Sequence, residues 1–167
     1  MYTLLTKETK ILKYFDFFKK ISFKYIQEVG EDLPVAYHSL IRDDEACYQS
    51  TSLAVSMARR WGTRLHVLHV SSEKELSLFE NKDLKDKKIT AETCPHYLLL
   101  CDEDYARYGS RIKCNPALKH ASDKSAVLAA LKAGRIDTLG SDHAPHLLSE
   151  KQGNALTAVS GCPSVQF

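Results

Sequence analysis

Apolar and polar positions divide this chain into alternating segments of helix and strand pattern. The clearest helix is predicted from residue 43 or 44 to residue 61, with Asp43 or Asp44 as its N-cap and Gly62 after its last turn. Its buried face follows the three- and four-residue spacing of an amphipathic helix and comprises Ala46, Leu53, Ala54, Met57, Ala58 and Trp61. This segment therefore predicts a helix that packs one side against a core.

The other helical segments are shorter or less regular. Helices are predicted at residues 72–79 and 122–134, with Ser122 as the cap of the second, and residues 102–108 are predicted to form a short helix or a turn. Residues 6–29 also look helical, but apolar side chains cover more than one face and lysines lie between them. This stretch is either a partly buried helix or one whose packing partner is missing. We therefore separate an atypical N-terminal helical segment, residues 1–29, from residues 30–167.

Strand patterns alternate with these helices. Strands are predicted at residues 35–38, 64–72, 89–94, 111–114 and 136–139, and residues 98–100 either extend the third of these or begin the next connection. The run at 64–72 is almost continuously apolar and is interrupted by two histidines, as in strands covered on both faces. The order of strand, helix and strand implies right-handed βαβ units and a parallel sheet, so the fold class is α/β.

Two α/β architectures place their chemistry at the carboxyl ends of parallel strands, namely the (β/α)8 barrel and the doubly wound sheet. The chain has no glycine-rich phosphate loop, which disfavours a nucleotide-binding sheet. A barrel needs eight strands and about 200–250 residues. Since only four or five strands are predicted here, the chain is expected to form part of a barrel.

Composition narrows the class of protein further. The 167 residues include 23 basic and 21 acidic ones and no basic block interleaved with aromatic residues, which argues against nucleic acid as a partner. No apolar run approaches the roughly 18–20 residues of a membrane span, and the first residues do not resemble a signal peptide. Five cysteines without a Cys-x-x-Cys pair predict buried free thiols in a reducing, cytoplasmic setting.

The segment from Ile136 to His146 carries the strongest chemical signal. Strand-prone residues lead into a Gly-Ser turn, which is followed by Asp142, His143 and His146. A strand that ends in titratable side chains is typical of an α/β active site, although an exposed polar loop would have the same composition. Asp142 suits the roles of ligand, base and acid. His143 is expected to buttress its neighbour.

Further candidates follow other predicted strands. His66 and His69 lie three apart on one strand and so point to opposite faces, and His69, nearer the carboxyl end, is the better ligand. His66 is expected to be a packing histidine. Imidazole and carboxylate groups are both common zinc ligands, so His69 and Asp142 are predicted to share a zinc-type ion. Asn115, held by Pro116, suits recognition of a cyclic amide but also fits a simple turn. His96 is a supporting or structural group, whereas no function is assigned to His38 and His120.

Four sequence segments together resemble the dihydroorotases of the amidohydrolase superfamily. They are His-Val-Ser-Ser at 69–72, Glu-Thr-Cys-Pro-His-Tyr-Leu at 92–98, Lys-Cys-Asn-Pro at 113–116 and Gly-Ser-Asp-His-Ala-Pro-His at 140–146. The segment Arg-Asp-Asp-Glu-Ala-Cys at 42–47 and the Ser-Gly-Cys-Pro stretch at 160–163 make the resemblance closer. The similarity covers roughly residues 30–167.

The resemblance implies strands five or six to eight of a (β/α)8 barrel, with one or two zinc ions in the complete enzyme. It also implies reversible hydrolysis of dihydroorotate, a small-molecule substrate, to N-carbamoyl-aspartate in pyrimidine biosynthesis, in a protein that can form a homo-oligomer. By position, His69 and Asp142 would be metal ligands and Asp142 the catalytic proton shuttle. Asn115, His146, Ser160 and Gly161 would bind the substrate.

The chain also departs from the family's pattern. The family's His-x-His pair with its nearby arginine, its bridging carboxylate and its fifth-strand histidine are not found in this sequence. The chain alone is therefore expected to be inactive or nearly so, and its open strand edges to promote aggregation. Two alternatives remain: another cyclic amidohydrolase, such as a dihydropyrimidinase or allantoinase, and a non-catalytic dihydroorotase-like partner protein.

Overall fold

The computed structural model describes residues 10–166, and the chain divides into two compact units, the first ending at Leu33 and the second beginning at Pro34. The first unit contains helix α1, Lys10–Val29, which ends at Gly30 with a φ of 105°. The helix predicted for residues 6–29 is thus confirmed from Lys10 onward, and residues 6–9 lie outside the described part. None of the described helices is long and apolar enough to cross a membrane.

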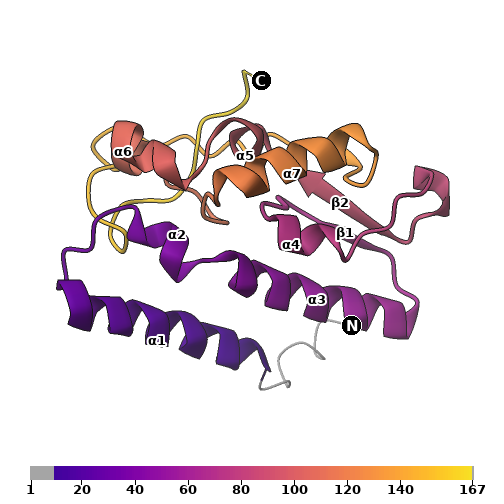
Figure 1. The fold of residues 1–167 in the computed structure, drawn as a ribbon, viewed down its shortest axis with the longest axis horizontal. Coiled ribbons are helices and arrows are strands. Elements are labelled where there is room, and N and C mark those ends of the chain that lie inside the picture. Colours follow the sequence, from indigo (N-terminus) through magenta and orange to yellow (C-terminus); the bar gives the residue numbers. More distant parts are fainter. Residues whose placement is uncertain (1–9, 167) are drawn as a thin grey trace. The chain divides into compact units, whose positions relative to one another are not determined.

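The second unit is built on a three-stranded parallel sheet in the order β1-β2-β3. Figure 1 shows β1 and β2 beside each other. Its strands are β1, Leu65–Val67; β2, Ile89–Thr93; and β3, Thr138–Leu139. Leu65 pairs with Ile89, and Thr93 pairs with Leu139. The predicted parallel α/β arrangement is therefore present, as a short sheet with β2 in its centre.

Three helices cover one face of this sheet: α3, Asp44–Trp61; α4, Glu73–Leu76; and α7, Ala121–Lys132. Val55 of α3, Leu76 of α4 and Val127 of α7 form a core with Ala91 of β2. Successive strand side chains alternate between the two faces of a sheet, so the residues between those of the core lie on the other face, which is polar. There His66 is exposed and its Nδ1 lies 2.7 Å from Thr90 Oγ1, so His66 is not the packing residue that the sequence suggested.

Short helices connect these elements and carry a second core. They are α2, Tyr37–Ile41; η1, Leu84–Asp86; α5, Pro95–Leu99; η2, Asp102–Asp104; α6, Tyr105–Tyr108; and η3, Gly109–Ile112. The second core contains Cys94, Tyr97, Tyr105, Ile112, Cys114, Leu118 and Cys162. All five cysteines are free thiols and four are buried, which confirms that part of the prediction.

Two predicted strands are wrong. Residues 35 and 36 form a turn, with the Tyr37 N–H donating to Pro34 O at 2.9 Å, and residues 37 and 38 already belong to α2. Residues 111–114 begin inside η3 rather than in a strand. The two segments contact each other, since His38 Nε2 lies 3.0 Å from Cys114 O.

The other predicted helices and strands are present in the structure, but they begin or end at different residues. The strand predicted at 64–72 is confirmed only for Leu65–Val67, because His69 has a φ of 45°, which a strand does not accommodate. Residues 95–99 form α5, which begins with Pro95 in the first helical turn, where proline is favoured. The cap position of α7 is His120 rather than Ser122, with the His120 N–H donating to Asp123 Oδ2 at 3.1 Å.

Helix α3 confirms most of its prediction. Asp43 Oδ1 accepts from the Ala46 N–H at 2.8 Å, and Gly62 adopts the left-handed C-cap conformation. The buried face is rotated from the expected one, since Val55 is buried whereas Trp61 is 69% exposed. Trp61 lies in the last turn, beyond the end of the sheet core that the helix covers, and Arg60 stacks on its ring.

A buried ion pair joins the beginning of β2 to the segment before β3. Lys87 Nζ lies 2.7 Å from Asp137 Oδ1 and donates to Gly134 O at 2.9 Å, and Asp137 Oδ2 accepts from the Ala91 N–H at 2.9 Å. Both side chains are at most 5% exposed. Every polar atom of this pair thus has a partner, which is the condition under which a buried pair is stable.

Removing the cation of this pair is expected to destabilise the fold strongly. Lys87→Met leaves the Asp137 carboxylate buried without its partner, which typically costs about 3–5 kcal/mol. Lys85→Met is the matched control, because Lys85 pairs with Asp83 at 3.9 Å on an exposed surface and should change stability by less than about 0.5 kcal/mol. Urea unfolding measures both variants, and equal free energies of unfolding would contradict the role assigned to Lys87.

Candidate active site

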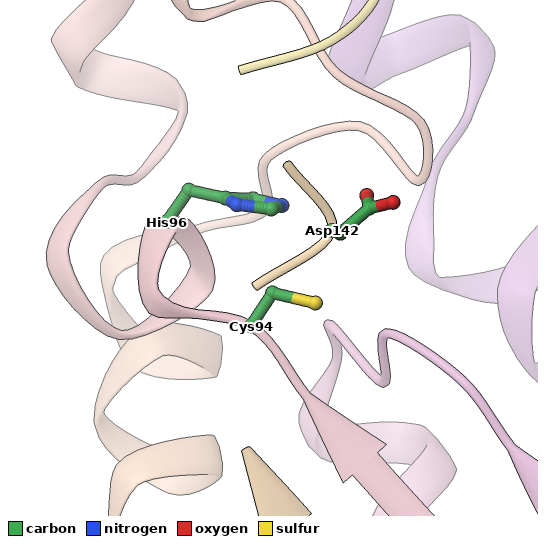
Figure 2. A group of neighbouring side chains, drawn as sticks. All are labelled: Cys94, His96 and Asp142. Atoms are coloured by element: carbon green, nitrogen blue, oxygen red, sulfur yellow. The ribbon is translucent and has the colours of Figure 1, made fainter. Parts of the chain in front are cut away.

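The carboxyl ends of the three parallel strands bring four titratable side chains to one edge of the sheet. His69 follows β1, Cys94 and His96 follow β2, and Asp142 follows β3. The Cys94 Sγ, a His96 ring nitrogen and an Asp142 carboxylate oxygen all lie within 4.8 Å of one another. Figure 2 shows Cys94 directly after the strand, His96 on the helix behind it and Asp142 on a separate segment.

Cys94 and His96 are fixed by the junction of β2 with α5, with Pro95 between them. Both are buried, and neither ring nitrogen of His96 has a hydrogen-bond partner among the described residues. Burial lowers the pKa of His96 to about 4, although the Asp142 carboxylate acts in the opposite direction. Burial, with the nearby charges of Asp142 and Glu92, raises the pKa of Cys94 to about 12. At neutral pH His96 is therefore an uncharged imidazole.

The two predicted metal ligands share an uncommon backbone conformation. His69 has a φ of 45° and Asp142 a φ of 44°, and these are the non-glycine residues with positive φ in the part of the chain that is described. Such conformations are tolerated by His and Asp better than by most residues, and they cluster at functional sites. The conformation turns each side chain out of the direction that its strand would give it.

The turn that holds His69 is braced by β2. The Val70 N–H donates to Glu92 O at 2.7 Å, and Thr93 Oγ1 donates to Val70 O at 2.8 Å. His69 itself is half-buried, and a charge on its ring would lower the pKa of His96. The ring atoms of His69 are not in the three-residue group, so His69 lies next to Cys94, His96 and Asp142 rather than among them.

Asn115 is positioned by a residue that the sequence had set aside. His38 Nε2 lies 3.1 Å from Asn115 Oδ1 and 3.0 Å from Cys114 O, and the peptide bond from Asn115 to Pro116 is cis. Burial lowers the pKa of His38 to about 4, and the positive charges of Lys113 and Arg42 act in the same direction. A neutral His38 thus holds the Asn115 amide in one orientation.

His146, Ser160 and Gly161 come together with the Asn115 segment through backbone contacts. A Cβ atom on Gly161 would lie 2.8 Å from His146 Nε2 and 2.7 Å from Ala144 O, so Gly161 packs directly against His146. The Gly161 N–H donates to Lys113 O at 2.9 Å. Ser160 is half-buried beside it, and His146 is exposed.

A buried lysine, Lys151, joins these segments through hydrogen bonds. Lys151 Nζ donates to the carbonyl oxygens of Lys113, Val159 and Gly161, each at 2.9 Å. These three bonds use all the protons of the ammonium group. Burial lowers the pKa of Lys151, and the three carbonyls compensate for the lost hydration. Nothing in the local sequence distinguishes Lys151 from an exposed lysine.

Two histidines have structural partners. His143 Nδ1 accepts from the backbone N–H groups of Ser164 and Val165 at 3.0 and 3.1 Å, which attaches the final segment beside Asp142. His120 Nδ1 lies 2.7 Å from Asp102 Oδ2 on the surface. His143 therefore acts as a support for the site, as the sequence suggested.

The residues at this edge suit a zinc-type metal by their chemistry. Imidazole, thiolate and carboxylate are the protein ligands of zinc. Among the described residues the buried His96 imidazole has no hydrogen-bond partner, and a metal ion bound to one of its ring nitrogens would supply that partner. The edge also contains the predicted nitrogen and oxygen ligands, His69 and Asp142. The donor set present is thus compatible with the metal that the family resemblance implies.

Comparisons with known proteins show which family the chain is similar to. No family model matches the chain. It is 40% identical over 112 residues to a dihydroorotase of Lactiplantibacillus plantarum, covering 67% of this chain and 26% of that protein. It is 32% identical over 136 residues to an allantoinase of Bacillus velezensis, covering 81% of this chain and 30% of that protein. The structure of a D-hydantoinase from Bacillus sp. AR9 superposes with a TM-score of 0.79 at 25% identity, covering 90% of this chain and 34% of the other.

The α/β fold, the chemistry at its strand ends and these matches define the chain as a member of the cyclic amidohydrolase family. Within that family it is a partial match to the dihydroorotases and their relatives, and it corresponds to a fragment of an amidohydrolase. The chain spans about a quarter to a third of the length of the relatives it matches.

Acid is expected to loosen the His38 contact. The pKa of His38 is near 4 when folded and near 6.5 when unfolded, so the unfolded chain binds the proton more tightly. Stability from His38 is therefore complete above pH 6.5 and falls as the pH drops to 4, by on the order of 2–3 kcal/mol. The measurement is the free energy of unfolding in urea as a function of pH. His38→Gln, which keeps a donor near Nε2, should reduce the slope of this dependence between pH 4 and pH 6.5, and His120→Gln should not. An unchanged slope in His38→Gln would refute the assignment.

Proposed function

We propose that the chain contributes the last strands of a zinc-dependent dihydroorotase barrel. In this proposal β1, β2 and β3 are strands six to eight of a (β/α)8 barrel, and the helix-free polar face of the sheet faces the barrel interior. The observation that carries the proposal is the similarity to dihydroorotase over 112 residues. It is supported by the positions of His69 and Asp142, which follow the carboxyl ends of β1 and β3 in one parallel sheet. The reaction is the reversible hydrolysis of dihydroorotate to N-carbamoyl-aspartate.

Each residue of the proposed site has a role that fits its surroundings. His69 and Asp142 would hold the zinc ion, which when bound polarises the amide carbonyl of the substrate. Asp142 is exposed at the strand edge, so its carboxylate can take a proton from water and deliver it to the leaving nitrogen. Asn115, fixed by His38, offers both a donor and an acceptor to the ring amide.

The substrate carboxylate would lie between His146 and the Ser160-Gly161 backbone. Gly161 is the residue that lets this backbone approach His146, because a side chain at its φ of 145° would occupy the same space. Lys151 holds the loop in this position through the Gly161 carbonyl. The two segments together form the wall against which an anionic substrate would be oriented.

A second candidate is a neighbouring activity on another cyclic amide. The D-hydantoinase structure matches 90% of the chain, and the match to the allantoinase covers 81% of it. Hydantoin, dihydrouracil and allantoin share with dihydroorotate an amide within a ring but lack its carboxylate. The contacts to that carboxylate, from His146 and Gly161, therefore separate the two candidates.

A chimera tests the proposed function. Residues 34–167 replace the aligned segment of the Lactiplantibacillus plantarum dihydroorotase, and both directions of the reaction are assayed alongside hydantoin, dihydrouracil and allantoin. We expect turnover of dihydroorotate by the chimera and none by the 167-residue chain alone, which contains two of the predicted ligands. A chimera that prefers hydantoin, dihydrouracil or allantoin would favour the second candidate. Turnover by the 167-residue chain alone would refute the claim that its site is incomplete.

Gly161→Ala in the chimera is expected to weaken substrate binding. The added methyl group displaces His146 or the Ala144 carbonyl, so KM for dihydroorotate should rise by about tenfold or more while kcat changes less. Ser160→Ala is the matched control, because it leaves the backbone in place and should keep KM within about twofold. Steady-state kinetics measure both, and equal KM values for the two variants would contradict the contact between Gly161 and the substrate carboxylate.

A further inference from the structure

We infer that Cys94, His96 and Asp142 form a metal site of their own, which binds one thiophilic divalent cation such as Zn²⁺. The ligands are Cys94 Sγ, one ring nitrogen of His96 and one carboxylate oxygen of Asp142 (Figure 2). This site differs from the predicted pair of His69 and Asp142, with which it shares one residue. It goes beyond the proposed function, because it requires neither a substrate nor the other strands of a barrel.

The spacing of the three ligand atoms approaches the spacing that one zinc ion requires. Zinc bonds of about 2.0–2.3 Å place two ligand atoms about 3.5 Å apart, and the three atoms here lie within 4.8 Å of one another. The remaining adjustment of about 1 Å falls to Asp142, which is exposed and can rotate about its side-chain bonds. Cys94 and His96 are buried and already point to one place, so most of the site is formed before a cation binds.

The second observation is the unpartnered imidazole. Both ring nitrogens of His96 are buried and neither has a hydrogen-bond partner among the described residues, although buried polar atoms in folded proteins nearly always have one. The ring extends towards the segment that carries Asp142 (Figure 2). A cation on the Asp142 side of the ring would satisfy one nitrogen directly.

The charges around Cys94 also favour a cation. Asp142 and Glu92 both act electrostatically on the Cys94 sulfur, so negative charge gathers where the thiolate would form. A thiolate selects zinc, cobalt or cadmium over magnesium or calcium, which prefer oxygen ligands. The class of ligand is therefore a borderline or soft divalent metal and excludes the hard cations.

Cobalt binding to the full 167-residue chain tests the site without any assay of activity. The purified chain is stripped with chelator, kept reduced and titrated with Co²⁺, and the near-ultraviolet thiolate-to-cobalt charge-transfer band is recorded. We expect the band to saturate at one equivalent and to disappear when Zn²⁺ is added. Elemental analysis of the zinc-loaded chain after desalting should give about one ion per chain, as one site requires.

Variants assign the ligands. Cys94→Ser should abolish the band, and Asp142→Asn should weaken cobalt affinity by at least about tenfold, a cost that even residues outside the metal's direct ligands can have. Asp142 is exposed, so this variant keeps the test valid even if the buried substitution impairs folding. Cys47→Ser is the control, because Cys47 is a half-buried thiol outside the group, and it should bind cobalt like the unmodified chain.

Several results would overturn the inference. They are a chain that binds no cobalt, a band that survives in Cys94→Ser, and a band lost in Cys47→Ser. Zinc binding abolished by His69→Gln but unaffected by Cys94→Ser would assign the ion to His69 and Asp142 instead. These outcomes are independent of the chimera, whose turnover depends on substrate binding and on the strands that the other protein supplies.

Discussion

The parallel pairing of β2 with a strand on each side is the constraint on which the rest of the structure depends. Val70 donates to Glu92 from the β1 side, and Gly140 donates to Thr93 from the β3 side, so loops distant in sequence are fixed to the same short strand. A Cβ atom on Gly140 would lie 2.3 Å from a Glu92 carboxylate oxygen, so a side chain at this position would displace the end of the Glu92 side chain. The side chains after all three strands therefore gather at one edge.

Charged groups buried away from that edge keep the loops in place. Lys87 joins the strands at their amino ends through Asp137, and Lys151 joins the Gly161 loop to the Asn115 segment through three carbonyls. Lys119 likewise donates to Arg42 O and Ala117 O at 2.9 and 2.7 Å. Ammonium groups, with three donors each, replace the regular secondary structure that these irregular segments lack.

Local signals in the sequence were sufficient for some elements and not for others. Helix α3 and strand β2 were predictable because caps, periodicity and strand-forming residues lie within each segment. The segments around His38 and Lys113 were mistaken for strands. Their backbones instead close tight turns, in which the Tyr37 N–H donates to Pro34 O and the Lys113 N–H donates to Ser110 O, and a contact between residues 76 apart joins the two segments. The grouping of Cys94 with His96 had a usable signal, namely two ligand residues around a proline at a strand end. That Asp142, which follows β3, lies near these two residues could not be predicted from the periodicity of the sequence.

The left-handed backbone at His69 and Asp142 bears on how such a protein can change over evolutionary time. Asn and Gly accept this conformation as readily as His and Asp do, whereas Val, Ile and other bulky residues do not. A lineage can therefore replace either side chain with Asn or Gly and keep the turn. Selection for folding alone then preserves the architecture but not the chemistry, and a descendant without activity would remain a well-folded protein.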